Sequence, residues 1–147
     1  MRESAKGSKA ANRPGHLLHQ QQVTTKRRGD LAELLAREHL QRRGLRWVQS
    51  NFRTPGRGGG EIDLIMCEPD GTLVFVEVRQ RSRSDFGGAA ASIGAAKRRR
   101  IVLAARHYLM RLSSAPPCRF DAVLVQGMPG DQLHVEWIKA AFDASGF

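Results

Sequence analysis

The sequence has few cysteines and no long apolar run. Cys67 and Cys118 are its only cysteines, and neither belongs to a CxxC or paired-histidine motif, which argues against a zinc site and gives no sign of a disulfide. We expect both thiols to be buried. No apolar stretch approaches the roughly 20 residues that a membrane-spanning helix needs, and Leu17-Leu18 is too short for the core of a signal peptide. These absences favour a cytoplasmic protein.

The sequence also lacks the motifs of two common enzyme classes. It contains no GxSxG and its histidines are scattered, so it gives little support to serine-hydrolase chemistry. The glycine run 58–60 precedes an expected strand rather than a helix, and it lacks the Lys-Ser/Thr ending of a nucleotide-binding loop. We interpret these glycines as turn residues.

Acidic residues are scarce relative to basic ones. The 147 residues include 24 Lys and Arg against 14 Asp and Glu, so the net charge is +10. This balance favours a polyanionic partner, either nucleic acid or an anionic membrane surface. Residues 1–28 hold seven basic residues and one acidic residue and show no apolar periodicity. We therefore expect a disordered basic tail over 1–27 and one folded domain over 28–147.

Apolar spacing along the rest of the chain predicts an α/β fold. The elements expected in chain order are a helix over 29–43, strands over 45–53, 61–67 and 72–80, a loop over 82–91, a helix after Gly94 that Pro116-Pro117 ends, and strands over 119–125 and 133–137. The first three strands form a predicted meander. A helix between this meander and a later strand indicates a mixed five-stranded sheet flanked by helices.

Two carboxylates are expected to lie close together in the meander. Glu77 and Arg79 end one face of an otherwise apolar strand, and a carboxylate there needs a cation or a metal as its partner. The hairpin brings Asp63 of the preceding strand near Glu77. Because Mg²⁺ is commonly held by one or two carboxylates with waters and phosphate oxygens, we predict a metal site. The structural alternative is a salt bridge from Glu77 to Arg79 or another neighbouring base.

Two further acids are candidates for the same site. Glu61 shares a strand face with Asp63, but it follows three glycines and could simply pair with Arg57 on the loop. Glu33 lies at the border of the apolar face of the first helix, where its side chain can curl toward the sheet. The alternative for Glu33 is an ordinary solvated glutamate.

Several short segments together carry a resemblance to a known family. They are Ala32-Glu33, Asn51-Phe52-Arg53, Gly60 to Ile65, Val74 to Arg79, Phe86-Gly87, Lys97, Tyr108-Leu109 and Arg119-Phe120-Asp121. With these segments the chain resembles the YraN family of bacterial proteins. That family is similar to the Holliday-junction resolvases of the PD-(D/E)XK, restriction-endonuclease-like superfamily.

The resemblance implies a restriction-endonuclease-like fold and hydrolysis of phosphodiester bonds with Mg²⁺ or Mn²⁺. Branched DNA is the candidate substrate. It places Asp63, Glu77 and Glu33 at the positions of the superfamily's metal ligands. Arg79 stands where the superfamily usually has lysine, and a guanidinium cannot act as a base. Arg79 would then stabilise charge on the transition state, or Lys97 would supply the missing ammonium from the second helix. Because resolvases work as dimers, the resemblance also implies a homodimer.

Basic residues near these acids are candidates for holding a nucleic-acid backbone without reading its sequence. They are Arg57, Arg81, Arg83, Lys97, Arg98, Arg99 and Arg100. The alternative for residues 97–100 is a solvated basic turn. The segment Phe86-Gly87-Gly88 is expected to form a loop near the active edge.

Two other functions remain open on the sequence. The first is a nucleic-acid-binding module of the same fold that has lost catalysis, which the arginine at position 79 favours. The second is a basic adaptor that binds a protein or a membrane surface through its tail.

Overall fold

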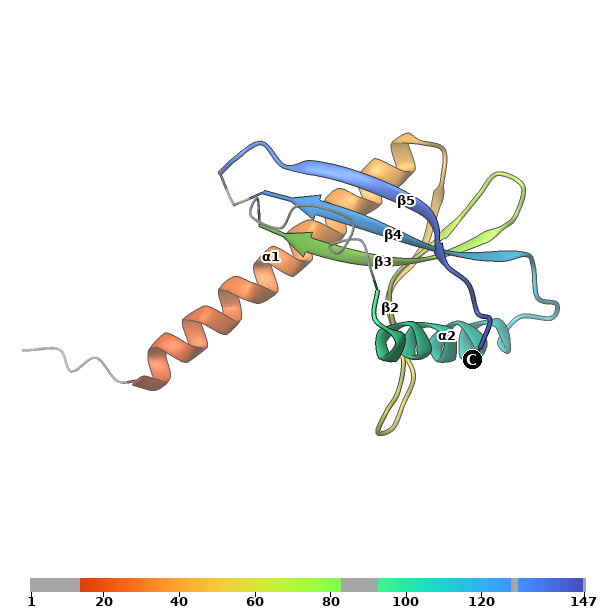
Figure 1. Ribbon diagram of the computed structural model, residues 1–147, viewed down its shortest axis with the longest axis horizontal. Helices are drawn as coiled ribbons and strands as arrows, with labels where there is room; N and C mark the ends of the chain where they lie inside the picture. Colours follow the sequence, from red (N-terminus) through yellow and green to blue (C-terminus); the bar gives the residue numbers. More distant parts are fainter. Residues whose placement is uncertain (1–13, 83–92, 128–129, 147) are drawn as a thin grey trace, which may run out of the picture.

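The computed structural model of the chain describes residues 14–82, 93–127 and 130–146 (Figure 1). Its elements are α1 (Pro14–Arg42), β1 (Arg46–Arg53), β2 (Glu61–Cys67), β3 (Leu73–Arg81), α2 (Ala95–Leu109), β4 (Cys118–Gln126) and β5 (His134–Phe142). The predicted order of helices and strands is therefore confirmed. The loop expected over 82–91 falls almost wholly outside the described residues.

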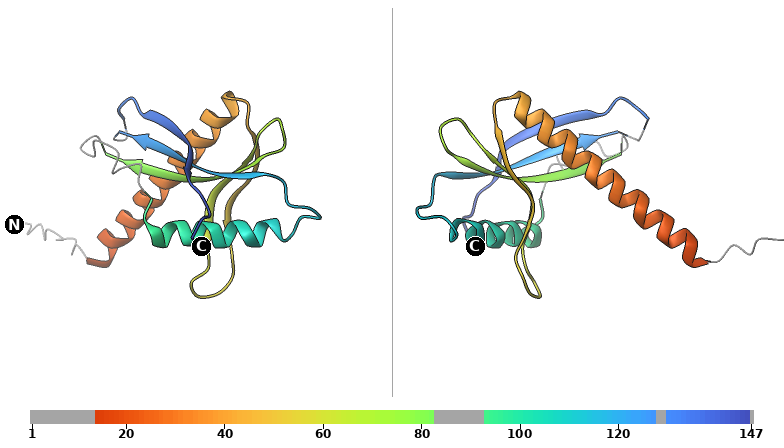
Figure 2. Two further views of the ribbon diagram at one scale, coloured as in Figure 1. Left: turned by 45° about the vertical axis from the view of Figure 1, so that its right-hand side comes forward. Right: turned by 180° about the vertical axis from the view of Figure 1, so that it is seen from behind.

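Helix α1 is much longer than the sequence predicts. It begins at Pro14 rather than at residue 29, so the prediction of disorder was wrong for residues 14–27. Proline is well suited to the first turn of a helix, and the glutamines and leucines that follow are good helix formers. This half of α1 extends beyond the sheet (Figures 1 and 2), which explains why its sequence lacks the apolar periodicity of a packed helix. Among the described residues, no helix is long and apolar enough to cross a membrane.

The five strands form one mixed sheet in the order β1-β2-β3-β4-β5. Neighbouring strands are antiparallel except β3 and β4, which are parallel because α2 connects them as a crossover. The predicted mixed five-stranded sheet flanked by helices is confirmed. Strand β5 runs to Phe142, beyond its predicted end at 137. An irregularity in the β4–β5 register between Phe120 and Ala122 and a positive φ at Ala140 break the alternation that would have indicated the longer strand.

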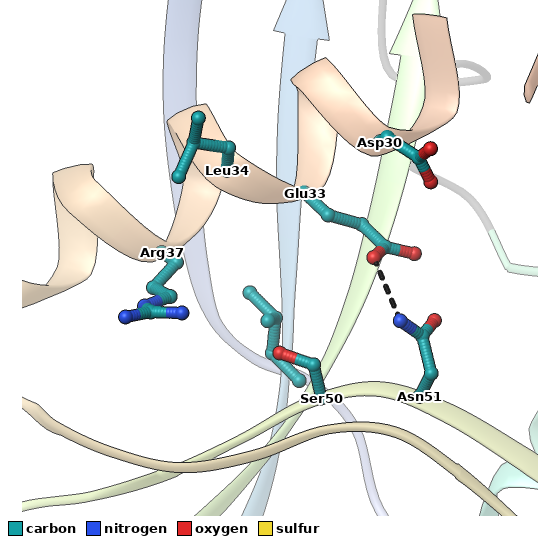
Figure 3. Close-up of a pocket in the computed structure, with 7 residues that line it drawn as sticks. Asp30, Glu33, Leu34, Arg37, Ser50 and Asn51 are labelled. Carbon is teal, nitrogen blue, oxygen red and sulfur yellow. Dashed lines mark hydrogen bonds between the residues drawn. The ribbon is translucent and has the colours of Figure 1, made fainter. Parts of the chain in front are cut away.

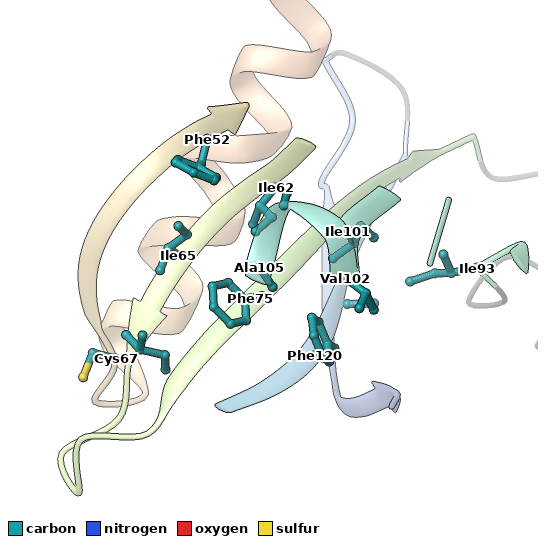
Figure 4. Close-up of a cluster of buried hydrophobic side chains, with 13 residues drawn as sticks. Phe52, Ile62, Ile65, Cys67, Phe75, Ile93, Ile101, Val102, Ala105 and Phe120 are labelled. Carbon is teal, nitrogen blue, oxygen red and sulfur yellow. The ribbon is translucent and has the colours of Figure 1, made fainter. Parts of the chain in front are cut away.

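The sheet has a core on each face, and the two helices cover different faces. On the α2 side, Ile101, Val102 and Ala105 pack against Phe75 and Phe120 (Figure 4). On the α1 side, the buried residues are Ala32, Ala36, Leu40, Leu45, Leu64, Met66, Val74, Val76, Val123 and Val125. The predicted alternation of side chains along β3 is thus confirmed. Leu73 and Phe75 enter the α2-side core, and Val74 and Val76 enter the α1-side core.

The two cysteines differ in exposure. Cys67 is buried in the α2-side core, as expected, and both thiols are free. Cys118 is exposed, so the prediction that it is buried was wrong. It begins β4 directly after Pro117, where the strand has not yet entered the core.

Candidate metal and nucleic-acid site

Asp63 lies where strands β2 and β3 stop pairing. Their last paired positions are Leu64 and Val76. Beyond this pair, the backbone N–H of Val78 donates a 2.8 Å hydrogen bond to Oδ2 of Asp63. The carboxylate therefore takes the place of a backbone acceptor, and it is fixed in the gap between the two strands.

Glu77 is the buried member of the acidic pair. Its exposed fraction is 8%, and Nζ of Lys97 lies 3.6 Å from its Oε1. Its Oε2 is buried and has no hydrogen-bond partner in the described part of the chain. A buried carboxylate oxygen without a partner is costly, and either a proton shared with the neighbouring side chain of Asp63 or a cation between the two carboxylates would satisfy it.

Each carboxylate of the pair acts on the ionisation of the other. Burial, and then the negative charge of Asp63, raise the pKa of Glu77 from 4.5 to about 8, while Lys97 and Arg79 act in the opposite direction. Burial also raises the pKa of Asp63, against the hydrogen bond from Val78. Two carboxylates in this position therefore resist ionising together unless a cation joins them.

Lys97 reaches Glu77 because α2 packs tightly against the start of β2. A Cβ atom on Gly60 would lie 2.1 Å from the backbone oxygen of Arg100 and 2.8 Å from the backbone nitrogen of Ala104. Only glycine permits this approach. Helix α2 starts after Gly94, so its first turn, which holds Lys97, lies beside the acidic pair.

Glu33 lies on the α1 side of the sheet and is half-buried (Figure 3). Its Oε2 accepts a 3.1 Å hydrogen bond from Nδ2 of Asn51 on β1. Burial raises the pKa of Glu33, the bond from Asn51 opposes this, and the charge of Asp63 adds to the increase. Within the described residues, no three His, Cys, Asp or Glu side chains are grouped so that they could hold a metal. The structure thus brings Asp63, Glu77 and Lys97 together but leaves Glu33 apart.

Glu61 has a structural partner. Its Oε1 lies 3.2 Å from a guanidinium nitrogen of Arg53, and both side chains are well exposed. The two residues are opposite each other in the β1–β2 register. The structural interpretation of Glu61 was therefore sound, although its partner is Arg53 rather than Arg57, because cross-strand neighbours meet more readily than a strand and a loop tip.

The predicted basic contacts differ in their surroundings. Arg57, Arg99 and Arg100 are exposed, the first in the β1–β2 turn that extends past α2 (Figures 1 and 2). Arg98 is half-buried: its Nε donates a 2.6 Å hydrogen bond to the carbonyl oxygen of Ile93. Its guanidinium carbon lies 5.9 Å from the centroid of the Phe142 ring. Arg98 therefore braces the start of α2.

Three other arginines were predicted to act at the site: two lie on β3 and the third follows the strand. Arg79 is half-buried, and burial lowers its pKa. Arg81 is also half-buried and donates a 2.8 Å hydrogen bond to the carbonyl oxygen of Gln80. Arg83 and the segment 86–88 lie outside the described residues.

Sequence reasoning did not single out the role of Asp121. This carboxylate is fully buried and accepts hydrogen bonds from Arg119 at 2.8 and 3.0 Å, from Nε1 of Trp137 at 2.9 Å and from the backbone N–H of Ala140 at 2.9 Å. Arg119 also bonds Glu68 at 2.9 Å. Asp121 ties β5 to β4 and is fully satisfied, so its role is structural. An acid between apolar strand residues, two positions from an arginine, was the available signal.

The fold and the site define an α/β protein with an acidic pair, one member of which is buried and faces a lysine. Residues 32–125 match the model of Uncharacterised protein family UPF0102. A UPF0102 protein of Polaromonas naphthalenivorans is 66% identical over 128 residues, which cover 84% of each chain. A UPF0102 protein of Paracidovorax citrulli is 64% identical over 122 residues, or 83% of this chain and 87% of the relative. The chain belongs to this family, which is the YraN family that its sequence resembles.

Proposed function

We propose that this protein binds nucleic acid and hydrolyses phosphodiester bonds in a divalent-metal-dependent reaction. The observation that carries the proposal is the close pair of Glu77, which is buried, and Asp63, with the ammonium of Lys97 3.6 Å from Glu77. The resemblance to the resolvase-like nucleases agrees with this arrangement. A cytoplasmic location would give the protein access to such substrates.

The residues fit Mg²⁺ or Mn²⁺. Asp63 and Glu77 offer hard carboxylate oxygens, and Mg²⁺ is typically bound by one or two carboxylates with substrate phosphate oxygens and water. A cation held by these two residues would offset both the burial and the repulsion by Asp63 that raise the pKa of Glu77. Such an ion, when bound, lowers the pKa of a water ligand and neutralises charge on the phosphoryl group.

Other side chains would act directly on the substrate. Lys97 carries an ammonium beside Glu77, where it can stabilise negative charge on the phosphate as a bond to oxygen breaks. Arg79 is close enough for its charge to act on Glu77, but it cannot take a proton from water. Glu33, held by Asn51, would act as an outer acid that orients the group bound at Asp63.

Nucleic-acid binding follows from charge. The net charge of +10 attracts a polyanion, and the exposed side chains of Arg57, Arg99 and Arg100 suit contacts with a phosphate backbone. Such contacts carry little sequence information, so we expect recognition of structure rather than of sequence.

A catalytically inactive nucleic-acid-binding module is the second candidate, favoured by arginine at position 79. A panel of labelled linear, single-stranded and branched DNA and RNA, incubated with the purified protein in Mg²⁺, Mn²⁺ or a chelator, separates the two. Cleavage that the chelator abolishes supports the nuclease. Binding without cleavage of any substrate supports the module.

A further inference from the structure

A small polar cleft opens between α1 and β1 beside Glu33 (Figure 3). Its volume is about 190 Å³. Figure 3 shows Asp30 and Glu33 at one end and Arg37 at the other, with Ser50 and Asn51 of β1 below them. The cleft therefore combines acceptors, donors and a cation in a space the size of a small ring system.

The basic end of the cleft is a preformed stack. The guanidinium carbon of Arg37 lies 4.0 Å from the centroid of the Trp47 ring. The ring is itself fixed, because its Nε1 donates a 2.9 Å hydrogen bond to Oγ of Ser50. A guanidinium has two flat faces, so one that rests on an aromatic ring by the first face can stack on another group by the second. Arg37 thus offers the cleft a planar stacking surface.

The acidic end is held in place by an unusual backbone conformation. Asn51 has a φ of 52°, a left-handed conformation that asparagine tolerates better than most residues. From this position its Nδ2 donates to Oε2 of Glu33. A carboxylate has several further acceptor sites, so the fixed Glu33 can also accept from a ligand.

The cleft lies near the proposed catalytic site but opens on the other face of the sheet. Leu64, which lines it, belongs to the α1-side core, whereas Glu77 faces Lys97 of α2. The charge of Asp63 nevertheless acts on Glu33 at the acidic end of the cleft. The exposed side chain of Leu34 adds an apolar wall on α1. A base seated between Leu34 and Leu64 would belong to a nucleotide close to, but not at, the phosphate bound by Asp63.

We propose that this cleft binds an unpaired nucleobase that carries an exocyclic amino group, so that the substrate is single-stranded or branched at the cleavage site. The inference rests on the proposed function and names its substrate class. A base is a flat, apolar ring with a polar edge, which matches the stacking surface of Arg37 and the apolar walls. In a duplex that edge is already paired, so a paired base is excluded.

The carboxylates determine which bases fit. The amino groups of cytosine, adenine and guanine can donate to Glu33 or Asp30. Thymine and uracil have no exocyclic amino group, and their single ring N–H donor lies between two carbonyl oxygens, which a carboxylate repels. We therefore expect an oligodeoxycytidylate to bind more tightly than an oligodeoxythymidylate of the same length.

Leu34 and Leu31 provide a matched pair of variants. Both lie on α1 with similar exposure, 48% and 44%, but only Leu34 lines the cleft. Leu34→Trp should fill the cleft without disturbing the core, and Leu31→Trp adds the same ring on the same helix outside it. Affinity is measured by fluorescence anisotropy of the two labelled oligonucleotides in a chelator at one fixed salt concentration.

The wild type and Leu31→Trp should bind oligodeoxycytidylate about tenfold more tightly than oligodeoxythymidylate, the scale of one hydrogen bond to a charged group. Leu34→Trp should bind the two about equally. The inference is overturned if the wild type shows no preference, or if Leu34→Trp keeps it.

A cleavage assay in Mn²⁺ separates this inference from the proposed function. Metal-dependent cleavage that does not distinguish paired from unpaired substrates, in the wild type and in Leu34→Trp alike, contradicts the cleft and supports the nuclease. A base preference that Leu34→Trp abolishes, in a protein that cleaves no substrate, supports the cleft and contradicts the nuclease.

Discussion

Nζ of Lys97 lies 3.6 Å from one carboxylate oxygen of Glu77, whereas the other oxygen, also buried, has no hydrogen-bond partner in the described part of the chain. The lysine therefore compensates only part of the cost of burying this acid beside Asp63. Residues that weaken the folded state in this way are typically kept for function. The site's stability and its proposed chemistry can both be tested through these side chains.

The free energy of unfolding of the metal-free protein should fall as pH rises from about 4.5 to about 8. Because the pKa of Glu77 is raised from 4.5 to about 8, the folded chain keeps a proton in this window that the unfolded chain has lost. The raised pKa of Asp63 acts in the same direction. Urea unfolding at a series of pH values measures the slope. Glu77→Gln should flatten it, and an unchanged slope in that variant would argue against the buried acid as its source.

Replacing Lys97 by methionine should raise the pKa of Glu77 further, because the ammonium favours the ionised carboxylate. The same change should slow cleavage by roughly 100-fold, the scale on which loss of one transition-state contact acts. Lys97→Arg, which keeps the charge, should recover part of the rate. Carboxyl NMR titration and cleavage rates report the two effects. Arg100→Met is the control, since Arg100 is exposed and should leave the Glu77 pKa unchanged.

Gly60→Ala should destabilise the protein by about 3 kcal/mol, the upper end of overpacking costs, because its Cβ would meet backbone atoms of α2 that cannot yield easily. The matched control is Gly29→Ala in α1, where a Cβ meets nothing within 4 Å. That change should stabilise by up to about 1 kcal/mol, since alanine favours a helix. Denaturant unfolding measures both, and equal effects would contradict the close approach of α2 to β2.

Asp121→Ala should cost about 3 kcal/mol, since it removes the buried acceptor of the Trp137 and Ala140 N–H groups and the ion-pair partner of Arg119. Asp131→Ala, at an exposed position, should change stability by less than about 0.5 kcal/mol. Thermal and urea unfolding compare the two. If Asp121→Ala were as stable as the wild type, the hydrogen bonds of Asp121 would not be what holds β5 to the sheet.

The alternation of side chains along the strands was enough to predict the layered fold and the closeness of Asp63 to Glu77. Alternation along β3 indicates directly which side chains enter each core. The ends of the helices were harder to predict from the sequence. Residues 14–27 show no apolar periodicity in the sequence, so no pattern there indicated the longer α1. The contact between Glu33 and Asn51 was also hidden, because it depends on a left-handed residue inside β1. The stack of Arg37 on Trp47 joins a helix and a strand, which spacing alone cannot reveal.

Glu61 and Glu77 offer the most direct test of metal-dependent cleavage. Both are strand glutamates near Asp63, but Glu61 is paired with Arg53 and Glu77 has an unpartnered oxygen in the described part of the chain. The measurement is the single-turnover cleavage rate in Mn²⁺, on a substrate with an unpaired segment, for wild type, Glu61→Gln and Glu77→Gln. The account predicts that Glu61→Gln cleaves at close to the wild-type rate and that Glu77→Gln loses at least about 100-fold. Equal rates for Glu77→Gln and the wild type would contradict it.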